Sequence, residues 1–245
     1  MEINYNEISE KYDEVREADL ELIRKFQKEI DFNKNINILD FGCGTGNYTN
    51  LLQEFTKANV YGVEPSAGMR QKALAKNEDL IIKAGDHEHI PFDGNFFDFL
   101  YMTDVIHHVP DLNQMFKEFI RVLKNEGLVC IETESHQQID ERFYVKYFPG
   151  TAEVDKNRYP SLDEIVQTAA DNGFSFVKNE LIGGMTKRRV DQAFLKLVEN
   201  KGYSMFHLIS EEEYQRGLKQ LKKDLNDGPF AVPSSGGTLV WLKKE

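Results

Sequence analysis

Between Asn35 and Glu134, short runs of β-branched and aromatic residues alternate with stretches in which apolar residues recur every three or four positions. A short apolar run predicts a buried strand, and a repeat of three to four residues predicts an amphipathic helix. Strands and helices in alternation are typical of a parallel sheet with helical crossovers. We expect the strands in the segments INILDFG, ANVYGVE, DLIIKAGD, FFDFLYMTD and GLVCIETES.

The clearest helical pattern is DLNQMFKEFIRVLKNEG, which follows the fourth predicted strand. Asp111 with Gln114 three residues later predicts a capping box, and Gly127 predicts the end of the helix. The apolar positions fall on one face of this helix and predict burial against the sheet: Leu112, Met115, Phe116, Phe119, Ile120 and Leu123.

The second half of the chain adds a helix in SLDEIVQTAADNGF, a sixth strand in FSFVKNELI and a seventh in TLVWLKKE. The last two strands are separated by Gly183 to Gly237, which is too long for a hairpin loop and predicts an inserted subdomain. This insert contains RRVDQAFLKLVENKGY and SEEEYQRGLKQLKKDL, and Ser210 with Glu213 predicts another capping box. A further irregular segment, residues 136–160, follows the fifth strand.

Composition narrows the classes of partner. A formal charge of −11 over 245 residues disfavours binding to nucleic acid. We see no apolar run long enough to span a membrane and no leader pattern, so a cytoplasmic protein without membrane association is expected. The only two cysteines, Cys43 and Cys130, predict neither a disulfide framework nor a metal site, and no metal is expected.

The loop after the first strand, ILDFGCGTGNYT, indicates a nucleotide-like cofactor. Glycines between a strand and a helix allow backbone N–H groups to approach a ligand closely. The spacing of Gly42, Gly44 and Gly46, followed by Asn47, differs from the G-x-G-x-x-G of dinucleotide sites. Asp40 precedes the loop and would face a cationic group, which suits an amino-acid moiety better than a pyrophosphate.

LDFGCGTG, together with the motifs that follow it, resembles the class I S-adenosylmethionine-dependent methyltransferases, in the small-molecule branch that includes the ubiquinone-biosynthesis enzymes. The resemblance covers about residues 36–135 and implies that the glycine backbone holds the methionine part of S-adenosyl-L-methionine. In VYGVEPSAGM it implies that Glu64 binds both ribose hydroxyls, with Pro65 and Met69 beside it.

The segment AGDHEHIPFDGNFFDFLYMTDVIHHVPD extends this resemblance. It implies that Asp86 binds the adenine amino group, that the backbone N–H of His87 reaches the ring, and that Thr103 and Asp104 lie beside the methionine portion. The fold it implies is an α/β Rossmann-like sheet of seven strands with strand seven antiparallel, helices on both faces, and helical inserts that form a cap.

The same resemblance divides the chain within a single methyltransferase domain, 1–245. Residues 1–34 would form an N-terminal cap helix region, where Tyr12 and Arg16 touch the cofactor; an ordinary amphipathic surface helix is the alternative. Residues 35–135 would form the cofactor-binding core. Residues 136–160 and 183–237 would form the substrate cap.

Methyl transfer from this cofactor, which leaves S-adenosyl-L-homocysteine, requires alignment of the acceptor and exclusion of water. A base is needed for a hydroxyl or carbon acid but not for a neutral amine, so an O, N or C acceptor remains open. His107 and His108 follow the fourth strand and are the candidate bases; the alternative is that they are loop histidines packed against their neighbours.

The predicted cap contains the candidate substrate residues. Tyr144 and Tyr147 would line a pocket or simply join the insert to the core. Arg188 and Arg189 are predicted at a helix start, where positive charge opposes the helix dipole. This unfavourable placement suggests that they bind an anionic group of an acidic substrate. The alternative is that they are simply charged residues exposed to solvent. Several inserts over one face favour an enclosed pocket and therefore a small molecule.

Three other functions compete with this interpretation. A tRNA or protein methyltransferase would share the core motifs, although the acidic composition disfavours RNA. An NAD-dependent oxidoreductase would share the acid after the second strand but not the glycine spacing. A cofactor-binding scaffold without turnover is the last, and no pattern indicates an oligomeric state.

Overall fold

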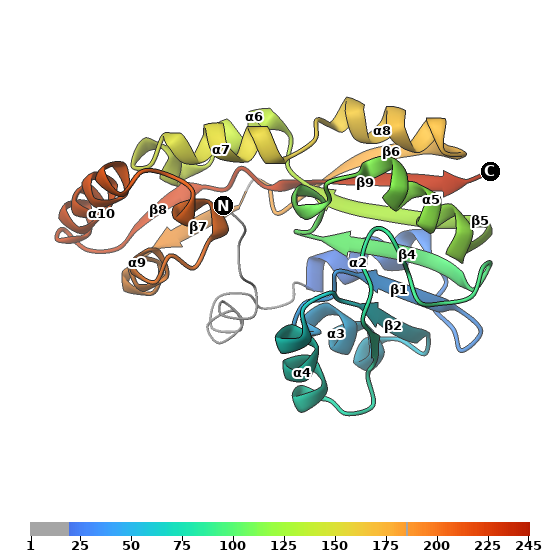
Figure 1. Cartoon of the computed structure of the whole chain (residues 1–245). Helices are drawn as coiled ribbons and strands as arrows, with labels where there is room; N and C mark the ends of the chain where they lie inside the picture. Colours follow the sequence, from blue (N-terminus) through green and yellow to red (C-terminus); the bar gives the residue numbers. More distant parts are fainter. Residues whose placement is uncertain (1–19, 185) are drawn as a thin grey trace.

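The computed structural model describes residues 20–184 and 186–245, and its centre is a seven-stranded sheet (Figure 1). The strand order is β3-β2-β1-β4-β5-β9-β6. Strands β1 to β5 are parallel, and β9 lies antiparallel between β5 and β6. The strands are β1 (Asn37–Phe41), β2 (Asn59–Val63), β3 (Ile81–Lys83), β4 (Phe97–Thr103), β5 (Leu123–Thr133), β6 (Phe174–Ile182) and β9 (Gly237–Lys244).

All seven strands expected from the sequence are present, and the α/β fold with an antiparallel seventh strand is confirmed. Strand β9 pairs with β5 from Leu128↔Lys243 to Thr133↔Thr238. The side chains of its central residues, including Trp241, are fully buried, because helices cover both faces of the sheet at this point.

The helices of the core cover opposite faces of the sheet. Phe26 of α2 packs against Phe99 and Trp241 on one face, with ring centroids 5.0 and 5.9 Å away. Phe116 of α5 packs with Ile165 of α8 on the other face. The core helices are α2 (Leu20–Glu29), α3 (Asn47–Phe55), α4 (Ala67–Lys76), α5 (Leu112–Val122) and α8 (Leu162–Asp171).

Helix α5 begins as expected, because the Asp111 side chain accepts a hydrogen bond from the Gln114 N–H at 3.0 Å. Its predicted end at Gly127 is wrong. The helix stops at Val122, since the next residue, Leu123, already pairs with Phe97 of β4. Strand pairing therefore overrides a helical pattern that continues through this segment.

The segments 136–158 and 187–233 form a second lobe, which we call the cap lobe (left in Figure 1). They share a hydrophobic cluster that contains Phe148 from the first segment and Phe194, Phe206 and Leu221 from the second. The cap lobe contains α6 (His136–Asp140), η2 (Phe143–Lys146), α7 (Gly150–Arg158), β7 (Lys187–Val190), α9 (Gln192–Glu199), η3 (Ser204–His207), α10 (Glu211–Leu225) and β8 (Phe230–Pro233).

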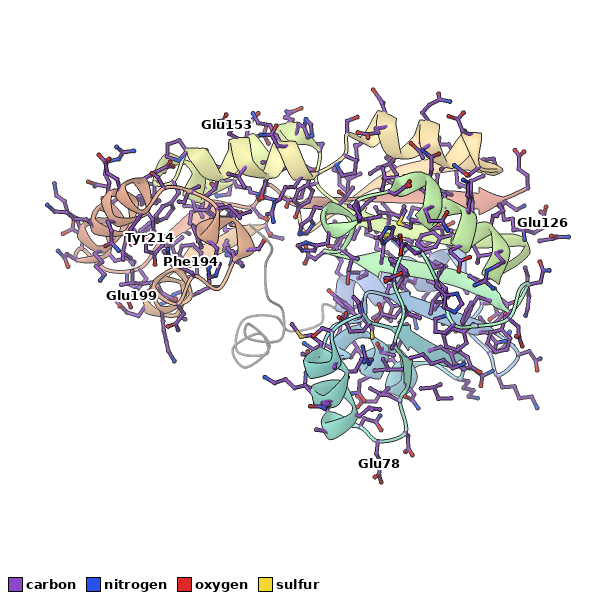
Figure 2. The ribbon with its side chains drawn as sticks, in the orientation of Figure 1. Glu78, Glu126, Glu153, Phe194, Glu199 and Tyr214 are labelled. Atoms are coloured by element: carbon purple, nitrogen blue, oxygen red, sulfur yellow. The ribbon has the colours of Figure 1, made fainter. Side chains whose placement is uncertain are left out.

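Figure 2 shows where side chains lie in the cap lobe: Phe194 and Tyr214 lie within it, whereas Glu153 and Glu199 are exposed.

The predicted helix start at Arg188 and Arg189 is wrong. Both arginines belong to strand β7, which pairs with β8, and α9 begins only after Asp191, whose side chain accepts hydrogen bonds from the first turn.

Paired glycines join the cap lobe to the sheet. Gly183 follows β6 with φ 63°, and Gly236 precedes β9 with φ 65°, so both have left-handed backbone. A β-carbon on Gly236 would lie 2.7 Å from the Ile182 carbonyl oxygen and 2.8 Å from the Gly184 nitrogen. The chain segments that leave and re-enter the sheet therefore pass each other with no room for a side chain.

Within the two described ranges, no helix has the length and apolar character needed to cross a membrane.

Candidate active site

The glycine loop folds tightly against the end of β2. The N–H groups of Gly42 and Cys43 both donate to the Val63 carbonyl, at 2.8 and 3.0 Å. Gly42 has φ 74°, and a β-carbon there would lie 2.6 Å from a methyl carbon of Val105. Gly46, with φ 75°, is the N-cap residue of α3. Glycine is thus required at Gly42 by both backbone angle and space.

Asp40, near the end of β1, is a buried carboxyl at the wall of a cavity. Its side chain is only 2% exposed, and its Oδ2 accepts a hydrogen bond from the Thr49 hydroxyl at 2.7 Å. Burial raises the pKa of Asp40 to about 7, and the nearby carboxylate of Glu64 adds to this rise. A ligand cation beside Asp40 would favour its charged form.

Glu64 follows β2, and its carboxylate is oriented by backbone groups on both sides. Oε2 accepts from the Gly44 N–H at 3.0 Å, and Oε1 accepts from the Ser66 N–H at 2.8 Å. Burial raises its pKa, while these hydrogen bonds oppose the rise. Of its expected neighbours, Pro65 is exposed and Met69 is buried in α4.

Asp86 follows β3, the next strand along the same edge. Its Oδ1 accepts hydrogen bonds from the N–H groups of Glu88 and His89, at 2.9 and 3.2 Å. Asp86 and His87 are both half-buried. The N–H of Glu64 donates to the Lys83 carbonyl at 3.1 Å, so β2 and β3 end side by side. The structure therefore places the predicted acids at the carboxyl ends of three adjacent strands.

A cavity of about 470 Å³ extends from the glycine loop into the cap lobe. The core contributes the loop, the ends of β4 and β5, and the start of α3; the cap lobe contributes aromatic and charged side chains. Of the residues predicted from the sequence, the cavity is lined by Asp40, Gly42, Gly44, Thr103, Asp104, His107, Tyr144 and Arg188.

The other predicted residues lie elsewhere. Nine of them are described by the structure but are not in the cavity wall: Gly46, Glu64, Pro65, Met69, Asp86, His87, His108, Tyr147 and Arg189. Tyr147 donates a hydrogen bond to Asp224 at 2.7 Å within the cap lobe. Arg189 has a side chain 72% exposed and pairs with Asp191 at 3.3 Å. Tyr12 and Arg16 lie outside the described residues.

The two candidate histidines have different surroundings. His107 is buried, lines the cavity, and stacks on Tyr159 with ring centroids 4.2 Å apart and planes 10° from parallel. His108 is exposed and is not in the cavity wall, and its ring centroid lies 3.9 Å from that of His107, with the two planes 49° apart. Only His107 is placed to meet a ligand in the cavity.

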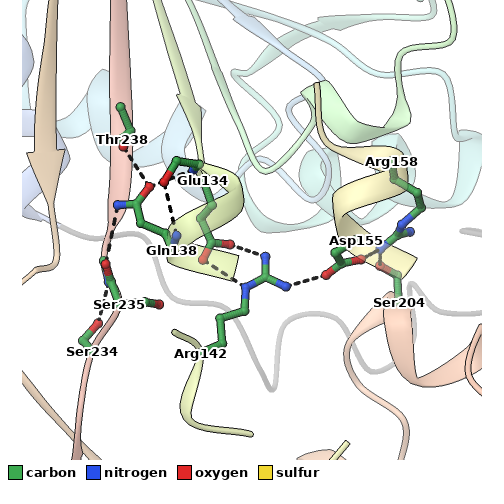
Figure 3. Close-up of polar contacts among 11 residues, drawn as sticks. Glu134, Gln138, Arg142, Asp155, Arg158, Ser204, Ser234, Ser235 and Thr238 are labelled. Carbon is green, nitrogen blue, oxygen red and sulfur yellow. Dashed lines mark hydrogen bonds and ion pairs between the residues drawn. The ribbon is translucent and has the colours of Figure 1, made fainter. Parts of the chain in front are cut away.

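A charged network at the junction between core and cap lobe was not predicted (Figure 3). Arg142 pairs with Glu134, which follows β5, and with Asp155 of α7. Asp155 also pairs with Arg158, which donates to the Ser204 hydroxyl at 3.1 Å. Burial raises the pKa of Glu134, and Arg142 opposes that rise. The sequence carries no local signal for these pairs, because their partners are brought together only by folding.

The strand order, the antiparallel β9, the glycine loop after β1 and the acids after β1, β2 and β3 define the Rossmann-like class I methyltransferase fold. The family model described as a methyltransferase domain matches residues 39–131.

Comparisons of sequence and structure agree with this class. An uncharacterized methyltransferase of Geobacillus thermodenitrificans is 32% identical over 148 residues, covering 56% of this chain and 68% of the relative. A demethylmenaquinone methyltransferase of Staphylococcus epidermidis is 27% identical over 193 residues, which cover 74% of this chain and 80% of the relative. A crystal structure from Anabaena variabilis, described as a methyltransferase from an antibiotic biosynthesis pathway, superposes with a TM-score of 0.74 at 22% identity. The superposition covers 92% of this chain and 98% of the Anabaena variabilis chain. The chain belongs to the class I S-adenosylmethionine-dependent methyltransferase family.

Proposed function

We propose that this enzyme transfers the methyl group of S-adenosylmethionine to a small molecule held between the glycine loop and the cap lobe. The observation that carries this proposal is a cavity to which both lobes contribute: Asp40 and Gly42 line it from the core, and Tyr144 and Arg188 line it from the cap lobe. A pocket of this size between two lobes suits a compact acceptor better than a macromolecule.

The residues of the core fit this cofactor. Asp40, buried with a pKa of about 7, suits a positively charged amino group, because the charged pair would relieve its burial. Gly42 leaves no room for a side chain where the backbone must approach a ligand. Glu64 is held by the N–H groups of Gly44 and Ser66 and retains lone pairs for two ribose hydroxyls. Asp86 is the proposed partner of the adenine amino group.

The bound cofactor supplies a methyl group on a positively charged sulfur, so the protein has to orient the acceptor and exclude water. Tyr144 and Tyr159 form part of the cavity wall on the cap side. For a hydroxyl or carbon acid, His107 is the proposed proton acceptor, since its ring lies at the cavity and is oriented by stacking on Tyr159. An amine acceptor would need no base.

The relatives support a small acceptor. The names of the Staphylococcus epidermidis enzyme and of the Anabaena variabilis protein refer to demethylmenaquinone and to antibiotic biosynthesis, which concern small molecules. The proposal includes a cytoplasmic location, because the described cysteines, Cys43 and Cys130, are buried and free, as is usual in a reducing compartment.

The test is incubation of the protein with methyl-labelled S-adenosylmethionine and, separately, a small-molecule extract, bulk tRNA and a protein fraction. We expect labelled product only from the small-molecule extract, with S-adenosylhomocysteine formed in equal amount. Label in tRNA or protein would replace this proposal with the macromolecular alternative. In parallel, S-adenosylmethionine but not NAD should raise the melting temperature, and the reverse would indicate an oxidoreductase.

A further inference from the structure

Among the residues that the structure describes, three arginines line the cavity, and two of them are neutralised by carboxylates. Arg142 pairs with Glu134 and Asp155, and Arg158 pairs with Asp155, as Figure 3 shows. The network leaves little of Arg142 accessible, since its side chain is 7% exposed. These two arginines are therefore committed to the junction between the lobes.

Arg188 differs from both. In the described part of the chain, no carboxylate forms an ion pair with it, and its one hydrogen bond is from Nη2 to the Tyr203 hydroxyl at 2.6 Å. Its guanidinium carbon lies 5.8, 5.4 and 5.9 Å from the ring centroids of Phe143, Phe194 and Tyr203. The positive charge of Arg188 is thus stabilised at the cavity wall by aromatic rings. Because contact with the ring faces does not use the N–H groups of the guanidinium as hydrogen-bond donors, these donors are left for a ligand.

The backbone around Arg188 is also fixed. Strand β7 pairs with β8 in the register Arg188↔Val232, and Asp191 ends the strand by capping α9. Both Arg188 and the neighbouring Arg189 are exposed, but Arg189 is not in the cavity wall and pairs with Asp191. Alternation along a strand explains why only one of two adjacent arginines reaches the cavity.

We propose that Arg188 binds an anionic group of the methyl acceptor, a carboxylate or a phosphate, at the cap end of the cavity. The planar guanidinium presents paired donors that match either group. Phe143 and Tyr203, which also line the cavity, would contact the apolar or planar part next to the anion. The acceptor class is thus an organic acid or phosphate ester whose reacting atom lies toward the glycine loop; this rests on the proposed function.

The test uses benzoate, phenyl phosphate and benzamide as probes, titrated calorimetrically with and without S-adenosylhomocysteine. Benzoate and benzamide share a ring and differ in charge. We expect benzoate or phenyl phosphate to bind at least about tenfold tighter than benzamide, and the tighter of the two identifies the anion. Arg188→Gln should remove this preference, whereas Arg189→Gln, its neighbour outside the cavity wall, should retain it.

The proposal is wrong if benzamide binds as tightly as the anions, if neither anion binds the wild-type protein, or if Arg188→Gln keeps the preference. A purely structural role for Arg188 would weaken all three probes equally and lower the melting temperature, and that result also rejects the proposal. Binding of S-adenosylhomocysteine is read in the same titrations. A protein that does not bind S-adenosylhomocysteine would contradict the proposed function. The titrations of the three probes in the absence of S-adenosylhomocysteine would still decide the role of Arg188.

Discussion

Asp40 is a residue whose burial is unfavourable until a cation lies beside it. Its pKa is about 7 in the folded protein and near 3.8 in an unfolded chain. The folded state therefore binds the proton more tightly, so stability falls as pH rises from about 4 to 7, and the cost is fully present above pH 7. A binding site that includes this residue is poised for a positively charged ligand.

Asp40→Asn should stabilise the ligand-free protein at pH 8, by as much as about 4 kcal/mol, because an amide has no charge to bury. Urea unfolding at pH 5 and pH 8 measures this, and the difference between variant and wild type should shrink at pH 5. Asp163→Asn, at an exposed position in α8, is the control and should change little. Equal stabilities at pH 8 would contradict the buried-charge argument.

Binding of S-adenosylmethionine to the wild type should weaken as pH falls below 7, by up to about tenfold per pH unit, since Asp40 must lose its proton to pair with a cation. Calorimetric titration between pH 5 and pH 8 measures the profile. In Asp40→Asn the affinity should be low and nearly constant over this range. An unchanged profile in the variant would show that another group binds the cation.

Gly42→Ala tests the glycine loop through two separable effects, a left-handed φ of 74° and a contact of 2.6 Å with Val105. We expect a loss of stability of about 2–4 kcal/mol, measured by urea unfolding, together with loss of cofactor binding. Adding Val105→Ala should recover the part due to the contact but not the part due to φ. Full recovery in the double variant would mean that φ carries no cost.

At the scale of elements, Arg142 joins the end of β5 to α7 by pairing with Glu134 and Asp155. Arg142→Met should destabilise the protein by about 3–5 kcal/mol, because it leaves the half-buried Glu134 without a cation and removes one of the two arginines that pair with the buried Asp155. Lys156→Met, which removes an exposed pair with Asp140 at the same helix, should cost less than about 1 kcal/mol. Thermal and urea unfolding compare the two, and similar losses would contradict the role of burial.

The elements that the sequence predicted well are those with a strong local signal. The seven strands contain short runs of β-branched, aromatic or other apolar residues. At the helix starts after Asp111 and Ser210, the side chain of each of these residues accepts a hydrogen bond from the third residue of the helix. Strand β7 was missed because Lys187–Val190 is short and mostly charged. Its formation depends on pairing with β8, where even the nearest pair, Val190↔Phe230, joins residues far apart in the sequence, and no local pattern reveals this.

The same distinction holds for the site. The positions of Asp40, Glu64 and Asp86 near the carboxyl ends of β1, β2 and β3 could be predicted from the sequence, Asp40 from the glycine loop beside it and the other two from the resemblance of their motifs. Their roles in binding stay predictions. The cap side was found only in part. Tyr159 and Tyr203 line the cavity but stand in segments without periodicity, and their positions depend on how the two inserted segments pack together.

At the scale of the whole molecule, two lobes meet at the cavity, and paired glycines carry the chain between them. Gly236→Ala should therefore disturb the junction, since its β-carbon would collide with backbone atoms that cannot rotate away. We expect a fall in melting temperature and weaker binding of benzoate, with S-adenosylhomocysteine binding retained. Gly228→Ala is the control: it also has positive φ, of 102°, but would meet no atom within 4 Å.

The position of β9 has a consequence for assembly during synthesis. It is the last of the seven strands in chain order, yet it lies between β5 and β6. Until β9 has left the ribosome, β6 has no partner in the sheet and β5 has only β4. The first five strands can pair as they emerge, whereas β6 must wait. Ribosome-bound chains that stop before Gly237 should be cut by protease within 174–182, and release of the full chain should give protection.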